Sequence, residues 1–371
     1  MPDIFVFGTL RHAPLLDLVA GEPVPTRPAH LPGFAAKCAS GGDFPVLVAD
    51  DTAAAPGLIA TVSEDAMARL DWYEAISDYV TVELEADAGD GPHRVRVWRP
   101  TGDQPHDPED WSLAAWQDGW APTLMRAAGE VMELYGKSPV APIARFWTNF
   151  LMRADSAVRA DAMDRPRVGS DRRHDSVTLQ GREITHLGYF MVRSEHLSHP
   201  TFAGGETPVL DRETFIAADA AVVLPYDPVR DRILLTEQFR MGPWCRGARY
   251  PWVLEPVAGR IDPGETPEAC ARRECVEEAG VEPDEMLPVA HYYPSTGSMT
   301  EFVYTYVGLC DLPDLPSGGG GVAHEGEDIK THLLSFDEGM DLLSSGEAVD
   351  GPLILLMLWL QRERPRLRRA A

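Results

Sequence analysis

Hydrophobic and polar positions change their spacing several times along the 371 residues of the chain. Short β-branched and aromatic runs fill the first hundred residues and predict strands, the first at residues 3–11, which breaks at Gly8-Thr9. From 107 to 164, apolar residues recur at three- and four-residue spacing, which predicts helices. Strand signals then return in three runs, Ile184–Val192, Ala220–Pro225 and Arg232–Phe239. The order predicts a mixed α+β protein with more than one domain.

A polar, charged and turn-forming stretch at residues 164–174 separates the two strand-rich regions. We therefore predict four segments: a first domain at 1–105, a helical appendage at 106–164, a linker at 165–178 and a second domain at 179–364. The tryptophans of the appendage are expected to pack inside it. A chain of this length is typical of two or three domains.

The most specific pattern runs from residue 259 to 281 and reads G-x5-E-x7-R-E-U-x-E-E-x-G-U, with U an apolar residue. Its seven fixed letters would coincide by chance with a probability on the order of 10⁻⁵. Thr266 suits a helix N-cap, Pro267 the first helical position, and Gly280 the left-handed residue that ends a helix. The pattern therefore predicts a helix over residues 267–279.

Three carboxylates share one face of this predicted helix. At about 100° per residue, Glu274, Glu277 and Glu278 fall within one arc, while Val276 and Ala279 point the opposite way. Like charges at this spacing destabilise a helix, and a hard divalent cation such as Mg²⁺ or Mn²⁺ removes the conflict. The alternative is a solvated acidic face of the helix. That alternative does not explain why the other fixed residues of the pattern fall at these offsets.

This pattern is the Nudix box, and the chain resembles the Nudix family from about residue 185 to 362, which implies an α/β/α sandwich. Three runs, Val223–Asp231, Glu237–Arg240 and Leu254–Gly259, resemble the ADP-ribose pyrophosphatase branch, including its tellurite-resistance-associated members. The resemblance implies that the box carboxylates and the carbonyl of Ala258 hold Mg²⁺ and that Arg240 faces the diphosphate. We also expect a homodimer through this domain.

The resemblance assigns further roles within this domain. The branch's acidic E-x-E-D-I loop is matched at Glu325–Ile329, which makes Glu325 the candidate general base and Glu327 an outer metal ligand. The glycine run at 318–321 would let that base swing in, or it is only a connector. The expected reaction is hydrolysis of ADP-ribose to AMP and ribose 5-phosphate. The branch's S-P-G turn is Ser295-Thr296-Gly297 here, which leaves the nucleotide-sugar preference open.

Four other box residues are expected to support the site without touching the substrate. Arg273 would brace the carboxylates, and Glu265 would orient the loop-helix-loop. Gly259 and Gly280 would supply backbone where a side chain would obstruct the turn. Glu278 is expected to be both a metal ligand and essential for catalysis.

Two motifs in the first hundred residues point to a second site. The strand break reads Phe7-Gly8-Thr9-Leu10, and an L-D-x-x-E motif ends at Glu74. Together they resemble the gamma-glutamylcyclotransferase family in its AIG2-like branch, which implies a mixed barrel. In that family the turn binds the glutamyl group through its N–H groups, and the acid acts as general acid/base. The family's usual glycine after the acid is Ala75 here, and the fold alternatively binds something else or nothing.

Composition narrows the function classes. The net charge of −25 opposes binding to nucleic acid or an anionic membrane. Five scattered cysteines without a C-x-x-C pair indicate neither a disulfide framework nor a zinc site, which fits a reducing cytoplasm. The N-terminus lacks a signal sequence, and the apolar run Leu353–Leu360 is too short to span a bilayer.

These features predict a soluble, cytoplasmic enzyme that acts on a small nucleotide sugar. The competing class is a nucleotide-sensing or binding protein with a non-catalytic first domain. The intact box favours the enzyme, because a pure sensor has no need for a full set of metal ligands. The basic stretch Arg362–Arg369 is either an interaction arm or a solvated terminus.

Overall fold

The computed structural model describes residues 1–371 apart from 41, 43, 103, 313, 315–327 and 371. The chain divides into two compact units. The first comprises Met1–Asp171 with Leu187–Tyr189, and the second comprises Arg172–His186 with Phe190–Ala371. No helix in the described residues is long and apolar enough to cross a membrane.

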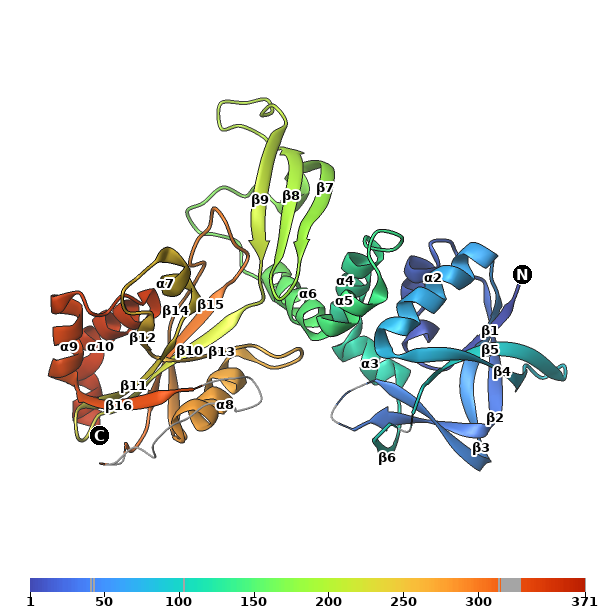
Figure 1. Cartoon of the computed structure of the whole chain (residues 1–371), viewed down its shortest axis with the longest axis horizontal. Coiled ribbons are helices and arrows are strands. Elements are labelled where there is room, and N and C mark those ends of the chain that lie inside the picture. The colour runs from blue at the N-terminus through green and yellow to red at the C-terminus, as the bar shows by residue number, and fades with distance from the viewer. Residues whose placement is uncertain (41, 43, 103, 313, 315–327, 371) are drawn as a thin grey trace. The chain divides into compact units, whose positions relative to one another are not determined.

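The first unit is built on a closed five-stranded barrel (Figure 1). Its strands follow the order β3-β1-β5-β4-β2, and β2 pairs back onto β3. The β1–β5 pair is parallel and the other pairs are antiparallel, so the predicted mixed barrel is confirmed. The bounds are β1 (Asp3–Val6), β2 (Thr26–Ala39), β3 (Pro45–Thr61), β4 (Tyr79–Asp87) and β5 (Pro92–Pro100).

A sixth strand, β6 (His106–Asp110), adds to β2 where the sequence pattern predicted the start of a helix. That part of the prediction was wrong. Pro108 interrupts a helical ladder, and Lys37 of β2 donates to the carbonyl of Pro108 at 2.8 Å and to Asp110 at 2.7 Å. These cross-strand contacts favour the extended conformation.

Helices complete the first unit. Two belong to the barrel, α1 (Ala13–Ala20) and α2 (Glu64–Glu74), with the short 3-10 turns η1 (Thr9–Arg11) and η2 (Ala75–Ser77) beside them. The region predicted to be helical contains four helices: α3 (Leu113–Gly119), α4 (Ala121–Met132), α5 (Val140–Arg145) and α6 (Trp147–Asp161). Trp116, Val131 and Phe150 are buried, so the apolar stripes of these helices form a core.

The second unit contains a seven-stranded sheet with helices on both faces. The strand order is β12-β11-β10-β15-β14, with β13 paired to β10 and β16 to β11. Helix α8 (Pro267–Ala279) packs with one face of the sheet through Cys275 and Ala279, next to Val223. Helix α10 (Gly351–Ala370) packs with the other face through Leu356, next to Leu224. The α/β/α sandwich is therefore confirmed.

The remaining elements of the sandwich are short. Its strands are β10 (Ala220–Asp227), β11 (Arg232–Phe239), β12 (Trp252–Glu255), β13 (Val257–Arg260), β14 (Glu285–Tyr292), β15 (Val303–Leu309) and β16 (Lys330–Ser335). Two further helices are α7 (Met241–Arg246) and α9 (Phe336–Ser345), and a 3-10 turn, η3 (His174–Ser176), precedes the first strand of this unit.

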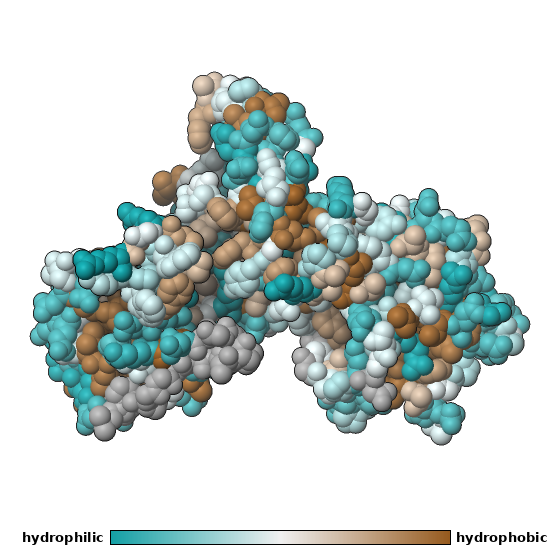
Figure 2. Space-filling model, in the orientation of Figure 1, coloured by the Kyte–Doolittle hydropathy of each residue, from teal (hydrophilic) through white to brown (hydrophobic). Residues whose placement is uncertain are grey.

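A separate three-stranded sheet precedes the sandwich. It consists of β7 (Thr178–Leu187), β8 (Met191–Ser198) and β9 (Leu210–Ile216). The single strand predicted at Ile184–Val192 was wrong, because the chain bends after Leu187 and splits that run between two strands. Several apolar side chains of this region are exposed, including Leu179, Phe202 and Phe215. Figure 2 shows hydrophobic residues among hydrophilic ones on the surface of this region.

The C-terminal helix is anchored rather than free. Arg364 Nε donates to Asp231 Oδ1 at 2.9 Å, Arg368 Nη1 lies 2.9 Å from Asp231 Oδ2, and Leu367 is buried. Arg364 and Arg368 of the basic stretch fasten α10 to the turn between β10 and β11. Arg362 and Arg366 instead pair with Glu363 on the helix itself.

Candidate active sites

Local signals fix the ends of helix α8. The Thr266 hydroxyl accepts a hydrogen bond from the Ala269 N–H at 3.2 Å, and Pro267 is the first helical residue. Gly280 adopts a left-handed φ of 63° directly after Ala279. The helix predicted over residues 267–279 is confirmed at both ends.

The three glutamates of this helix differ in exposure. The side chain of Glu277 is 37% exposed and that of Glu274 only 14%, while Glu278 as a residue is 2% exposed. Glu278 Oε2 accepts a hydrogen bond from the Ala258 N–H at 3.2 Å, so this carboxylate is turned toward strand β13. Glu278 is thus buried against the backbone of Ala258, the residue whose carbonyl the sequence resemblance assigns to the metal site.

The apolar residues of this helix differ in exposure. Val276 is 53% exposed, whereas Cys275 is fully buried. The buried face runs through Ala271, Cys275 and Ala279, at spacings of four residues, and this stripe turns Val276 to solvent.

Gly259 allows the closest approach in the site. A Cβ added at this position would lie 1.8 Å from Glu274 Oε1, so any side chain would displace that carboxylate. The thiol of Cys270 also points here, and it donates to the Arg260 carbonyl at 3.3 Å. The box glycine is therefore needed because α8 packs its carboxylate directly onto the strand.

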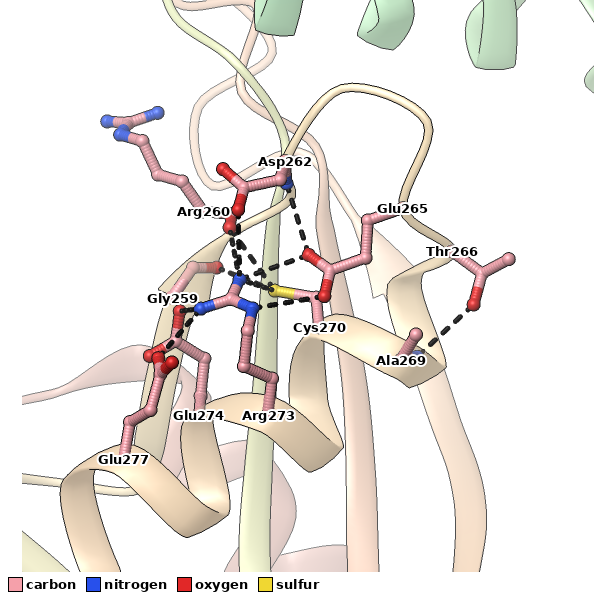
Figure 3. Close-up of polar contacts among 10 residues, drawn as sticks. All are labelled: Gly259, Arg260, Asp262, Glu265, Thr266, Ala269, Cys270, Arg273, Glu274 and Glu277. Carbon is pink, nitrogen blue, oxygen red and sulfur yellow. Dashed lines mark hydrogen bonds and ion pairs between the residues drawn. The ribbon is translucent and has the colours of Figure 1, made fainter. Parts of the chain in front are cut away.

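Arg273 links the carboxylates of the box to the preceding loop (Figure 3). Its Nε and Nη2 donate to the two oxygens of Glu265 at 3.1 and 3.0 Å. Its Nη1 donates to Glu274 at 2.7 Å and to Glu277 at 2.9 Å. The Glu265 hydrogen bond, together with the charge of Glu274, raises the pKa of Arg273 above its ordinary value. The like-charge conflict on the helix is thus relieved in part by this arginine, which the sequence analysis expected to brace the carboxylates.

The donor chemistry of the site fits a hard divalent cation. Three carboxylates and the carbonyl of Ala258 supply only oxygen, which Mg²⁺ and Mn²⁺ prefer. In the described part of the chain, no three His, Cys, Asp or Glu side chains converge closely enough to hold a metal by themselves. A cation bound here would also take water and other oxygen ligands, as is usual for Mg²⁺.

Arg240 is held by a residue that sequence reasoning missed. Its Nε donates to Glu255 Oε2 at 2.7 Å, across the β11–β12 pair. Nearby, burial raises the pKa of Asp350 to about 6, with a further contribution from the charge of Glu255. In the sequence, Glu255 stands out only as part of the run Leu254–Gly259. Its place in the strand just before the box was the one signal that could have indicated a role in the site.

Two predicted residues, Glu325 and Glu327, lie outside the described residues. The described chain resumes at Asp328, and Ile329 is buried just before strand β16.

In the first unit, every residue predicted for the second site lines one cavity of about 290 Å³. These residues are Phe7, Gly8, Thr9, Leu10 and Glu74. Burial raises the pKa of Glu74 to about 7, and the charge of Asp71 adds to the shift. A carboxyl group with such a pKa is suited to proton transfer at neutral pH.

The backbone around Glu74 does not require the family's usual glycine. Ala75 has φ −65° and ψ −17°, which any residue adopts, and it begins the η2 turn. The left-handed residue of this segment is Asp78, with φ 59°. The alanine therefore fits the turn without strain.

Several cavity residues could not be read from the motifs. Tyr79 and Trp98 come from β4 and β5, and Trp147 comes from α6. From the sequence, Trp147 was expected to pack inside the helical appendage. Its place in the cavity depends on how the helices fold back on the barrel, and no local signal reports that.

The sandwich and the box helix define a class, and the chain belongs to the Nudix hydrolase family. The NUDIX domain model matches residues 217–355, and a second model, gamma-glutamyl cyclotransferase, AIG2-like, matches residues 4–118. Members of the Nudix family generally use divalent metals such as Mg²⁺.

Named relatives match about half of the chain. The ADP-ribose pyrophosphatase of Haemophilus influenzae is 32% identical over 187 residues, which cover 50% of this chain and 86% of that protein. The Escherichia coli K12 ADP-ribose pyrophosphatase is 35% identical, with 50% and 88% covered. A GDP-mannose pyrophosphatase of Salmonella choleraesuis is 32% identical over 186 residues, with 50% and 95% covered. A solved ADP compounds hydrolase, 19% identical, aligns with a TM-score of 0.40 over 52% of this chain and 98% of its own.

Proposed function

We propose that the second unit hydrolyses the diphosphate of ADP-ribose, or of a related nucleoside diphosphate sugar, in the presence of Mg²⁺. With ADP-ribose the products are AMP and ribose 5-phosphate. The observation that carries the proposal is the packing of Glu274 and Glu278 against the backbone of Gly259 and Ala258. The ADP-ribose pyrophosphatase relatives support ADP-ribose as the substrate. The GDP-mannose pyrophosphatase relative makes GDP-mannose a second candidate.

Glu274, Glu277, Glu278 and the Ala258 carbonyl would hold the cation, with Glu327 outside them. When bound, the cation would neutralise charge on the non-bridging phosphate oxygens and make a water molecule easier to deprotonate. Arg273 keeps two of the carboxylates in position through its Nη1 hydrogen bonds. Arg240, held by Glu255, would face the diphosphate. Glu325 is proposed as the general base that takes the proton from water.

A product assay on the purified full chain tests this function. ADP-ribose, GDP-mannose and other nucleoside diphosphate sugars are each incubated with Mg²⁺, with Mn²⁺ and with a chelator. We expect AMP and ribose 5-phosphate from ADP-ribose only when a divalent cation is present. Tight binding of ADP-ribose without any turnover would instead favour the nucleotide-sensing alternative.

We also propose that the chain forms a homodimer through the second unit. The exposed apolar side chains of the three-stranded sheet, among them Leu179, Val209 and Phe215, support this assembly. Light scattering after size exclusion measures it, and a monomer at micromolar concentration would contradict it. The kinship with tellurite-resistance-associated members is proposed from the sequence runs alone.

A second function is proposed for the first unit because its motif residues and the raised pKa of Glu74 meet in one cavity. The reaction is intramolecular release of 5-oxoproline from a γ-glutamyl amide. The free α-amine attacks the side-chain carbonyl carbon, a C–N bond forms, and the C–N bond to the departing amine breaks. Glu74 takes the proton from the α-amine and returns it to the departing amine, so no water is consumed.

The backbone N–H groups of the Phe7–Leu10 turn would face the oxyanion that develops on the carbonyl. Gly8 lies close to Pro45, where an added Cβ would be 2.5 Å from the ring, so this turn is closely packed. Assay of 5-oxoproline from a panel of γ-glutamyl amides tests the proposal. Glu74→Gln should abolish release while the protein stays folded, and full release by this variant would assign the proton transfer elsewhere.

A further inference from the structure

The cavity that contains Glu74 is not enclosed by the barrel alone. Leu124 of α4 and Trp147 of α6 line it together with barrel residues such as Phe44 and Trp98. Both helical residues lie beyond the stretch 4–118 that matches the gamma-glutamyl cyclotransferase model. Leu124 is almost fully buried, so it is fixed in the wall. The appended helices are therefore part of the site and not only packing around it.

The cavity wall combines apolar and aromatic side chains with a few polar ones, among them Glu74, Ser77 and Gln104. Two of its polar atoms already have protein partners: the Tyr79 hydroxyl donates to the Pro45 carbonyl at 3.4 Å, and Trp98 Nε1 donates to Asp71 at 2.9 Å. Among the described residues that line the cavity there is no lysine or arginine. A second carboxylate on the ligand would therefore find no positive partner among these residues, which makes an uncharged substituent the better fit.

The size of the cavity sets a second limit. Its volume of about 290 Å³ lies at the lower end of the range for small-molecule sites, about 300–1000 Å³. That space suits a γ-glutamyl group with one ring-sized substituent.

We propose that helices α4 and α6 form the specificity wall of the first unit, and that the amine released there is small, apolar and preferably aromatic rather than an amino acid. Trp147 and Leu124 would cover the departing amine while Glu74 and the Phe7–Leu10 turn hold the glutamyl end. The inference rests on the proposed cyclotransferase function and names its substrate class.

The test uses the full chain and three probes that share the glutamyl group: γ-glutamylbenzylamide, γ-glutamylmethylamide and γ-glutamylglycine. We expect kcat/KM for 5-oxoproline release to be at least about tenfold higher for the benzylamide than for γ-glutamylglycine. Trp147→Ala should lower the benzylamide-to-methylamide ratio of kcat/KM about tenfold. Phe146→Ala is the matched control, because this neighbouring ring contacts Arg145 and does not line the cavity.

Equal turnover of γ-glutamylglycine and the benzylamide would overturn the specificity inference and leave the cyclotransferase function standing. So would an unchanged ratio in Trp147→Ala. If no probe is turned over, the cyclotransferase function fails, and equilibrium binding to the wild-type chain decides the inference. Benzylamide binding at least about tenfold tighter than γ-glutamylglycine, lost in Trp147→Ala, would then support the wall. Equal or undetectable binding would overturn it.

Discussion

Glu278 is the most buried of the three box carboxylates on helix α8. A buried carboxylate is unfavourable unless donors or a cation compensate it, and the Ala258 N–H supplies one donor. Glu277, on the same helix, is more exposed and bonds to Arg273 instead. We therefore regard Glu278 as the box carboxylate whose environment is most specific for a metal site.

Replacing Glu278 with glutamine should lower kcat for ADP-ribose by at least about 10²-fold, because it removes a charged metal ligand. The amide oxygen can still accept the hydrogen bond from Ala258, so the thermal unfolding temperature should change little. AMP release and thermal unfolding measure the two effects. Glu268→Gln is the control, since that carboxylate lies on the same helix and pairs with Arg272. Near-normal Mg²⁺-dependent turnover by the Glu278 variant would contradict the metal assignment.

Glu74 should give the first unit a characteristic pH dependence. Burial, followed by the charge of Asp71, raises its pKa to about 7, and a general base acts only when deprotonated. The kcat/KM for 5-oxoproline release should therefore rise with pH, with a midpoint at about 7. A pH profile from 5 to about 9 measures this midpoint. A midpoint near 4.5, the ordinary value, would show that a different or exposed carboxylate is the base.

The raised pKa of Glu74 also makes the stability of the first unit depend on pH. The folded pKa lies above the ordinary value, so the folded state binds this proton more tightly. The stabilisation is present at low pH and is lost as the pH rises from 4.5 through about 7. Glu74→Gln should for this reason be at least as stable as the wild type at neutral and higher pH, which separates lost activity from lost folding.

At the scale of elements, the anchoring of α10 depends on one acid in the turn after β10. Asp231 accepts hydrogen bonds from Tyr226 at 2.8 Å and from Arg364 at 2.9 Å, and it holds a left-handed φ of 63°. Burial alone would raise the pKa of Asp231, but Arg364, Tyr226 and the charge of Arg368 lower it below its ordinary value.

Asp231→Asn keeps a residue that tolerates the left-handed conformation, and it removes the charge together with one of the two acceptor oxygens. We expect the second unit to lose about 1–2 kcal/mol of unfolding free energy at pH 7. Because the folded pKa is lowered, this stabilisation is present above the ordinary pKa and is lost as the pH falls through the folded value. Urea unfolding at neutral and acidic pH should show the difference shrinking in acid.

The control for this variant is Asp337→Asn, which removes an exposed partner of the same Arg364. Its effect should stay within about 0.5 kcal/mol. An Asp231 variant no less stable than this control would mean that apolar packing alone fixes the helix.

Elements with local signals could be predicted from the sequence. Helix α8 has a threonine cap, a first-turn proline and a terminal glycine, so its two ends followed from neighbouring residues. Strand β6 could not be found this way, because its conformation depends on pairing with β2, about seventy positions earlier. The hairpin between β7 and β8 was missed because only Gly188 marks its turn within an apolar run.

The site residues follow the same division. Motif spacing predicted Glu74 and the Phe7–Leu10 turn as site residues, and the structure brings them together in one cavity. Trp147 and the Glu255 partner of Arg240 depend on contacts between elements distant in sequence. The burial of Glu278 also depends on the sheet beneath its helix, which helical periodicity alone does not describe.

At the scale of the whole molecule, each site is built from one unit. The box helix, strand β13 and Arg240 all belong to the second unit, and the cavity around Glu74 belongs to the first. The barrel has its own buried core, and the sandwich has a core on each face of its sheet. The described residues proposed for each site lie within a single unit.

The two proposed activities should therefore be energetically independent. Glu278→Gln should leave 5-oxoproline release within about twofold of the wild type, and Glu74→Gln should leave AMP release within the same limit. Saturating ADP-ribose should likewise leave the affinity for a γ-glutamyl amide unchanged, because coupling between binding sites is reciprocal and its free energy here is expected to be near zero. Calorimetric titration of each ligand, with and without the other, measures this coupling directly. A reciprocal shift of fivefold or more in both affinities, about 1 kcal/mol, would show instead that the fused units form one regulated enzyme.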